Sequence, residues 1–142
     1  MWRTGIAMAA VAFSVAAVAE QSKTFGDYVV HYNAFNSSSL SPEIAKRYGL
    51  IRGANQGVVN IVVLNKGDGG DKAAVAKVEG SVRNLLSQRA NLNFKEVRDG
   101  EAIYYLAGYR FDDQDTLVFD LQLTPEGANP LQLEFNQLMH VH

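Results

Sequence analysis

The side chains best suited to bind a polar ligand are four amides and one guanidinium in the first half of the chain. Asn33, Asn36, Arg52 and Asn55 lie in two polar segments on either side of a short predicted helix. Amides donate and accept hydrogen bonds, and a guanidinium pairs with carboxylates. If the two segments meet at one end of the fold, they form a site for a carboxylate, a sugar or a peptide backbone. The structural alternative is that the asparagines cap turns and that Arg52 pairs with Glu43 or a backbone carbonyl.

Two further candidates for binding lie inside predicted strands. Asn60 interrupts an apolar run, and an amide there needs hydrogen-bond partners if it is buried. It therefore either fixes a neighbouring loop or joins the ligand site. Tyr104 lies on the opposite strand face from Tyr105, so it is a candidate for a protein-binding patch. The alternative for Tyr104 is an ordinary cross-strand aromatic pair.

Histidines at the end of the chain are the candidate metal ligands. On a strand, His140 and His142 share a face, and two imidazoles can bind Cu²⁺, Zn²⁺ or Ni²⁺. His31 adds a third ligand only if the first and last strands are neighbours in a suitable register. A solvated chain end is the alternative, because tight sites normally have three or four protein ligands. Copper binding is therefore kept as a second hypothesis, and we expect no resident cofactor.

Only His31 is a plausible internal general base. A serine hydrolase would need the fold to bring a serine and an acid to it, and the chain has no G-x-S-x-G nucleophile elbow. Cysteine is absent, which excludes thiol nucleophiles, thiolate metal sites and disulfides. We therefore expect a protein that is not an enzyme, with a hydrolase that uses His31 as a further alternative.

The element that must organise these residues is the apolar segment 57–65, which is rich in β-branched side chains. Such a run is typical of a strand with both faces covered. The remaining segments have alternating apolar and polar residues, which indicates strands with one buried face. The other predicted strands are 25–33, 74–83, 92–98, 101–111, 116–124 and 131–141. Within segment 74–83, Gly80 suggests a bulge or a close backbone approach.

A short helix is predicted between the first two strands. Ser41 has the features of an N-cap and Pro42 suits the first helical position. Gly49 can adopt the left-handed conformation that ends a helix. Seven strands with turns at regular spacing indicate an all-β protein, an immunoglobulin-like antiparallel β-sandwich with one short helix. In it, the third to sixth strands are expected to form a meander of hairpins, and a small β-barrel is the alternative fold.

Residues 1–19 have the layout of a cleavable secretory signal peptide. One positive charge precedes a small apolar stretch, and Ala17-Val18-Ala19 forms an A-x-A cleavage site before Glu20. We therefore expect a single domain over residues 20–142 in the periplasm, with no membrane span after cleavage. The full chain carries 13 basic and 15 acidic residues without a basic stripe, so no nucleic-acid partner is expected.

Several short motifs make the chain resemble a bacterial family called domain of unknown function 4426. They are Phe25-Gly26-Asp27-Tyr28, His31-Tyr32-Asn33-Ala34-Phe35-Asn36, Pro42-Glu43, Tyr48-Gly49, Arg52, Asn60-Ile61 and Ala102-Ile103-Tyr104-Tyr105-Leu106. The resemblance runs from about Lys23 to Met139. It implies a small exported protein of Gram-negative bacteria with a β-sandwich fold, and it implies no activity. Our leading hypothesis is a non-enzymatic binding module whose partner is a periplasmic protein or peptide, held by a loop end or a strand edge.

Overall fold

The computed structural model describes residues 21–67 and 69–141. They form ten strands, one short α-helix and one 3-10 turn. The elements are β1 (Gln21–Phe25), β2 (Tyr28–Asn36), η1 (Ser37–Ser39), α2 (Pro42–Arg47), β3 (Gln56–Gly67), β4 (Gly70–Ala73), β5 (Ala76–Arg83), β6 (Arg89–Leu92), β7 (Lys95–Asp99), β8 (Ala102–Arg110), β9 (Asp115–Pro125) and β10 (Leu131–Met139). The predicted signal peptide lies outside the described residues.

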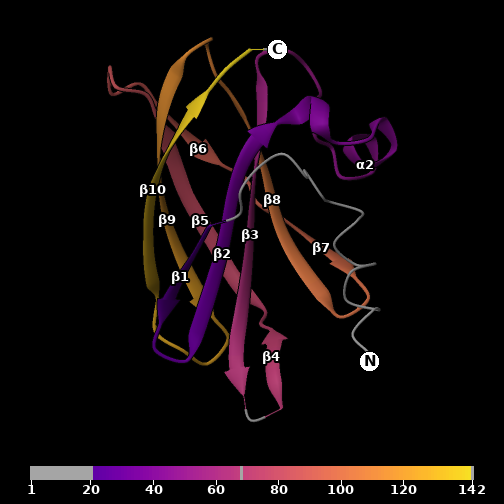
Figure 1. The fold of residues 1–142 in the computed structure, drawn as a ribbon, viewed down its shortest axis with the longest axis vertical. Coiled ribbons are helices and arrows are strands. Elements are labelled where there is room, and N and C mark those ends of the chain that lie inside the picture. The colour runs from indigo at the N-terminus through magenta and orange to yellow at the C-terminus, as the bar shows by residue number, and fades with distance from the viewer. Residues whose placement is uncertain (1–20, 68, 142) are drawn as a thin grey trace.

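Two antiparallel sheets pack face to face (Figure 1). The six-stranded sheet has the order β1-β2-β3-β8-β7, with β4 paired to the far end of β3. The four-stranded sheet has the order β10-β9-β5-β6. The sheets do not close into a barrel, so the sandwich prediction is confirmed and the barrel alternative is wrong.

The main core lies between the two sheets and is built by alternation along the strands. On β9, the predicted inward residues Leu117, Phe119, Leu121 and Leu123 are all buried. Aromatic rings join the layers: Tyr32 on β2 lies against Phe135 on β10 with ring centroids 4.5 Å apart. Alternate side chains on a strand point to opposite faces, which is why the pattern in the sequence identifies this core.

Strand β3 lies at the centre of the six-stranded sheet, between β2 and β8. Its residues Val58, Val59, Asn60 and Ile61 are consecutive and all buried. Odd-numbered residues of this run face the core between the sheets, and Val58 packs in a second cluster on the other face. The prediction that both faces of this segment are covered is confirmed.

The second cluster lies between the six-stranded sheet and α2, at the upper right in Figure 1. Helix α2 begins as predicted: the Ser41 side chain accepts a hydrogen bond from the Ile44 amide at 3.2 Å, and Pro42 is its first residue. After the helix, Gly49 has φ of +69°. Ala45 and the following Leu50 are buried beneath this turn of chain. The short helix therefore acts as a third layer over part of one sheet.

Three details of the predicted strands are wrong. Segment 92–98 is not one strand, because β6 ends at Leu92 in the four-stranded sheet and β7 begins at Lys95 in the other. The expected meander is absent for the same reason, since β5, β6 and β9 share one sheet while β7 and β8 belong to the other. Segment 25–33 is also divided, into β1 and β2, and β2 continues to Asn36, so Asn33 lies in a strand and not in a loop.

Gly80 has the close backbone approach that the sequence predicted. A Cβ at this position would collide with the Asp120 carbonyl oxygen of the neighbouring strand β9, and Gly80 has φ of +155°. Only glycine avoids this contact, so the residue allows β5 and β9 to pair at full length.

Candidate functional site

The two polar segments that flank α2 meet, as predicted. The Ser37 hydroxyl accepts a hydrogen bond from the Gly53 amide at 3.0 Å and donates one to the Gly53 carbonyl at 3.2 Å. Arg52 Nη2 donates to the Ser38 carbonyl oxygen at 3.2 Å. Arg52 therefore holds the two segments together through a backbone carbonyl, which is the structural alternative stated for it.

Two of the predicted asparagines also join chain segments. Asn36 Nδ2 donates to the His140 carbonyl oxygen at 2.9 Å and so fastens the C-terminal end to β2. Asn55 Nδ2 donates to the Phe111 carbonyl oxygen at 2.9 Å, while the Phe111 amide donates to the Asn55 carbonyl oxygen at the same distance. These side chains stabilise loops and are not gathered around an open site.

Asn33 and Asn60 are brought together on the outer face of the six-stranded sheet, the face that α2 partly covers. They are directly opposite each other in the register of β2 and β3. Asn60 is in turn opposite Leu106 on β8, and Leu106 is opposite Lys95 on β7. One row across the sheet therefore carries two amides, an apolar residue and an amine.

Asn60 has a polar atom whose hydrogen-bonding capacity is unused. The residue is 9 % exposed, and its Oδ1 atom has no hydrogen-bond partner. An unpaired amide oxygen costs about 1–3 kcal/mol when it is buried. The hydrogen bond that a buried amide is expected to make is therefore missing at this oxygen. Selection for folding alone would favour an apolar residue here, which makes Asn60 the strongest candidate for a ligand-binding side chain.

The residues around Asn60 define what we call the outer-face site: His31, Asn33, Asn60, Val62 and Lys95. His31 is opposite Val62 on β3, one row from the asparagine pair. His31, Asn33 and Val62 are partly exposed, and Lys95 is exposed at the sheet edge. Lys95 Nζ lies 3.5 Å from where a Cβ on Gly49 would stand, so the amine is beside the C-terminal end of α2. The site has amide, imidazole and amine groups next to apolar surface.

Tyr104 lies on the same face, two residues along β8 from Leu106. It is 9 % exposed and packs in the cluster beneath α2, opposite Val97 on β7. Its ring is therefore part of a packed layer, and it does not form the exposed aromatic patch that the sequence suggested.

The ionisable groups whose pKa values are shifted lie elsewhere. Glu96 accepts hydrogen bonds from Arg98 Nε at 2.8 Å and from the Tyr105 hydroxyl at 3.0 Å. The bond from Arg98 holds the pKa of Glu96 below its ordinary value. Burial raises the pKa of the Tyr105 hydroxyl, which also accepts a bond from the Ala76 amide at 2.9 Å. Burial also raises the pKa of Tyr109, by more than that of Tyr105, and the Tyr109 hydroxyl contacts Met139 Sδ at 3.3 Å. These tyrosines remain protonated and serve packing.

The predicted metal ligands are not assembled in the part of the chain that the structure describes. No group of three or more His, Asp or Glu residues suited to a metal ion occurs among residues 21–67 and 69–141. His140 lies beyond the end of β10, where its carbonyl binds Asn36, whereas His31 is five residues back along β2 from Asn36. That separation is about 16 Å along a strand. His142 lies outside the described residues.

The strand neighbours of His31 include a serine and no acid. Ser22 on β1 is directly opposite His31, and Val62 is opposite it on β3. On the same face of β2, the next residues in either direction are Val29 and Asn33. None of these four strand neighbours has a carboxylate, so the local geometry lacks the third member of a hydrolase triad.

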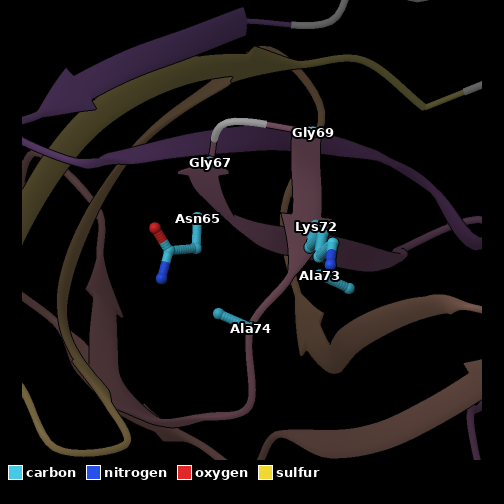
Figure 2. A pocket seen from close by; sticks show the side chains of 6 residues that line it. All are labelled: Asn65, Gly67, Gly69, Lys72, Ala73 and Ala74. Carbon is cyan, nitrogen blue, oxygen red and sulfur yellow. The ribbon is translucent and has the colours of Figure 1, made fainter.

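One hollow of about 510 Å³ lies at the end of the sandwich away from α2. It is lined by Asn65, Gly67, Gly69, Lys72, Ala73 and Ala74, at the hairpin of β3 and β4. Figure 2 shows Asn65 and Ala74 beside a common open space, with Lys72 and Ala73 on β4. None of the residues predicted from the sequence to bind a ligand lines it. One amide, one amine and glycine backbone give little chemical specificity, so the hollow is a weaker candidate than the outer-face site.

Similarity to known proteins agrees with this architecture. The sequence model of DUF4426, a domain of unknown function, matches residues 22–142. The chain belongs to the DUF4426 family. A crystal structure of a DUF4426 family protein from Pseudomonas aeruginosa PAO1 is 38 % identical, with a TM-score of 0.78 over 87 % of this chain and 96 % of that chain. No curated protein matches the sequence. The DUF4426 description names no activity, so the function must be argued from the site.

Sequence reasoning missed Lys95 as a member of the site. The residue begins a strand that was predicted to continue from Leu92, and its position opposite Leu106 depends on pairing between β7 and β8. A partial signal existed, because the hairpin at Asp99-Gly100 fixes which β7 residues share a face with Leu106. The pairing of Asn33 with Asn60 had no such local signal.

Proposed function

We propose that this DUF4426 protein is an exported, non-enzymatic binding module that holds a protein or peptide segment at the outer-face site. The observation that carries the proposal is the unpaired Oδ1 of buried Asn60. A bound backbone or side-chain N–H group would supply the missing hydrogen bond. Export is supported by the signal-peptide layout of residues 1–19, and a periplasmic location follows from it.

The surroundings of Asn60 favour a peptide over a small ion. Asn33 offers a second amide opposite Asn60, and the partly exposed Val62 and Leu64 offer apolar contact on the same face of β3. Alternating polar and apolar groups along a strand match the alternation of an extended peptide segment. Lys95 at the edge adds a positive charge for an acidic group of the partner.

Replacement of Asn60 by the apolar residue closest in shape separates binding from folding. For Asn60→Leu we expect an increase of about 1 kcal/mol in the free energy of unfolding, because an unpaired buried polar group is removed. Urea unfolding measures this. Asn136→Leu, at an exposed position on β10 in the other sheet, is the matched control and should leave stability nearly unchanged. A large loss of stability in Asn60→Leu would show that the amide is structural and would remove the basis of the proposal.

Binding itself is tested with a photo-crosslinking amino acid at Val62 in intact cells that produce the full chain. We expect one dominant adduct with another protein at Val62, which weakens when Asn60→Leu is introduced. The control position is Gln132, exposed on the outer side of β10. Equal adducts at both positions, or an adduct that is unaffected by Asn60→Leu, would contradict binding at the outer-face site.

The copper and hydrolase hypotheses have weaker support. Copper binding depends on His140 and on His142, and the latter lies outside the described residues. A hydrolase depends on an acid beside His31 that its strand neighbours do not provide. We therefore keep peptide binding as the single proposed function.

A further inference from the structure

The connection between β5 and β6 presents two leucines to solvent at its tip. Leu85 is 69 % exposed and Leu86 is 81 % exposed. The connection projects from the upper left of the sandwich in Figure 1, away from α2. Turns are normally built from polar residues and glycine, so adjacent exposed leucines at a projecting tip are unusual.

This tip has a defined shape. Asn84 Oδ1 accepts hydrogen bonds from the amides of Leu86 and Gln88, both at 3.0 Å. Asn84 Nδ2 donates to Gln88 Oε1 at 2.7 Å, and the Ser87 amide donates to the Asn84 carbonyl oxygen at 3.0 Å. Ser87 has φ of +65°, a left-handed conformation that is costly for a residue with a side chain. The network around Asn84 thus holds the leucines outward instead of letting them fold back onto the sheet.

The charged residues within the hairpin itself are positive. Between Ser81 and Leu92 the hairpin contains Arg83 and Arg89 and no acidic residue, in a chain whose net charge is −2. Arg89 Nη1 donates to the Ser81 hydroxyl at 2.7 Å, which leaves its other N–H groups available. Arg83 lies 4.0 Å from Glu134, an exposed pair of little strength.

A third exposed apolar side chain lies at the same end of this sheet. Leu138, 47 % exposed, is opposite Thr116 on β9, and Val118, two residues further along β9, is opposite Arg83. Leu138 therefore lies at the same end of the sheet as the tip, separated from it by Arg83 and the buried Val118.

We propose that the β5–β6 tip is a docking element for an anionic phospholipid surface, with Leu85 and Leu86 inserted among the lipids and Arg83 and Arg89 at the phosphate groups. Two apolar side chains flanked by arginines suit the boundary between head groups and acyl chains. A protein groove or a second copy of this chain could also cover leucines, but neither would require the flanking positive charges. The inference is independent of the outer-face site, which lies on the other sheet.

The absence of cysteine from the chain allows a site-specific test. The full chain is labelled at Leu86→Cys with an environment-sensitive nitrobenzoxadiazole dye and mixed with vesicles of phosphatidylcholine alone or with phosphatidylglycerol. We expect a several-fold rise in emission with phosphatidylglycerol vesicles and little change with phosphatidylcholine. Leu85→Cys, labelled in the same way, should give the same response, which would show that the rise does not depend on the position of the dye. Ile51→Cys, at a 68 % exposed apolar position near α2, is the control and should not respond.

Two variants of the labelled protein connect the response to the proposed contacts. Leu85→Ser should lower the partition onto phosphatidylglycerol vesicles about tenfold, because one leucine loses its transfer from water. Arg83→Gln should lower it several-fold and reduce its salt dependence.

No response at position 86, or an equal response at position 51, would overturn the proposal. An equal response to both lipids would overturn the anionic surface as the partner, and brightening without vesicles that grows with protein concentration would indicate self-association instead.

Discussion

At the scale of single residues, Gly57 on β3 is needed because a ring occupies the place of its side chain. A Cβ there would lie 2.5 Å from Cζ of Tyr109, the residue directly opposite it on β8. Tyr109 in turn packs edge-on against Phe119 with centroids 5.1 Å apart. The glycine therefore permits an aromatic contact that links the two sheets.

Substitution of Gly57 should disturb this contact. For Gly57→Ala we expect a loss of about 2 kcal/mol in the free energy of unfolding, because the buried Tyr109 ring must leave its preferred position. Urea unfolding followed by tyrosine fluorescence measures it. Gly108→Ala is the control, since the atoms nearest to its added Cβ are 3.8 Å away and the change should be close to neutral. Similar stabilities for the two variants would show that the ring moves aside without cost.

The predicted binding residues differ in whether their side-chain atoms have hydrogen-bond partners. Asn36, Arg52 and Asn55 all donate to backbone carbonyl oxygens, whereas Asn60 leaves its acceptor unpaired. Residue type identified the group of candidates but not their roles. An asparagine has the same side-chain chemistry whether it stabilises a loop or binds a ligand. Only the distances from its amide atoms to other protein groups distinguish these two roles.

At the scale of elements, the short helix α2 covers part of the outer face of the six-stranded sheet. Six residues are too few for a stable isolated helix, so its stability comes from packing and from its ends. Ile44 and Tyr48 pack against the second cluster, and Ser41 caps the first turn. The helix determines how much of the outer face of the six-stranded sheet remains accessible.

Loss of the cap should loosen this cover. Ser41→Ala should lower the free energy of unfolding by about 1 kcal/mol, since the Ile44 amide loses its acceptor. Hydrogen exchange should also become faster at the amides of α2. Ser39→Ala, at an exposed position in η1, is the control and should change neither quantity. Equal effects of the two substitutions would mean that the cap does not support the helix.

At the scale of the whole molecule, a polar network joins the two sheets beside the apolar core. The Tyr105 hydroxyl on β8 binds the amide of Ala76, the first residue of β5 in the other sheet, and donates to Glu96 on β7. Arg98 completes the network by its bond to Glu96. Because Glu96 is bonded as a carboxylate, the pKa of its side chain in the folded protein is below its ordinary value.

This network predicts a pH dependence of stability. A lowered pKa in the folded state means that the contribution of Glu96 is complete above the ordinary glutamate pKa of about 4.3 and is lost as the pH falls through the folded value. The urea midpoint should therefore fall more steeply below about pH 4.3 in the native protein than in Glu96→Gln. Glu101→Gln, at an exposed position in the neighbouring turn, serves as the comparison. Parallel curves for the native protein and Glu96→Gln would contradict a role for this carboxylate in joining the sheets.

The described residues contain no helix that is both long enough and apolar enough to cross a bilayer. The docking proposed for the β5–β6 tip is a contact with a membrane surface, which two leucines and two arginines can make without a span.

The sequence by itself determined which side chains face the core between the sheets and where the short helix begins. Both depend on neighbours in the chain: alternation on β9 buries Leu117, Phe119 and Leu121, and Ser41 caps its own helix. Tertiary structure alone decided that the chain changes sheets between Leu92 and Lys95, that Asn33 faces Asn60, and that Tyr104 packs in the same cluster as α2. These features depend on hydrogen bonds and packing between segments far apart in sequence, and a local pattern of residue types has no information about such partners.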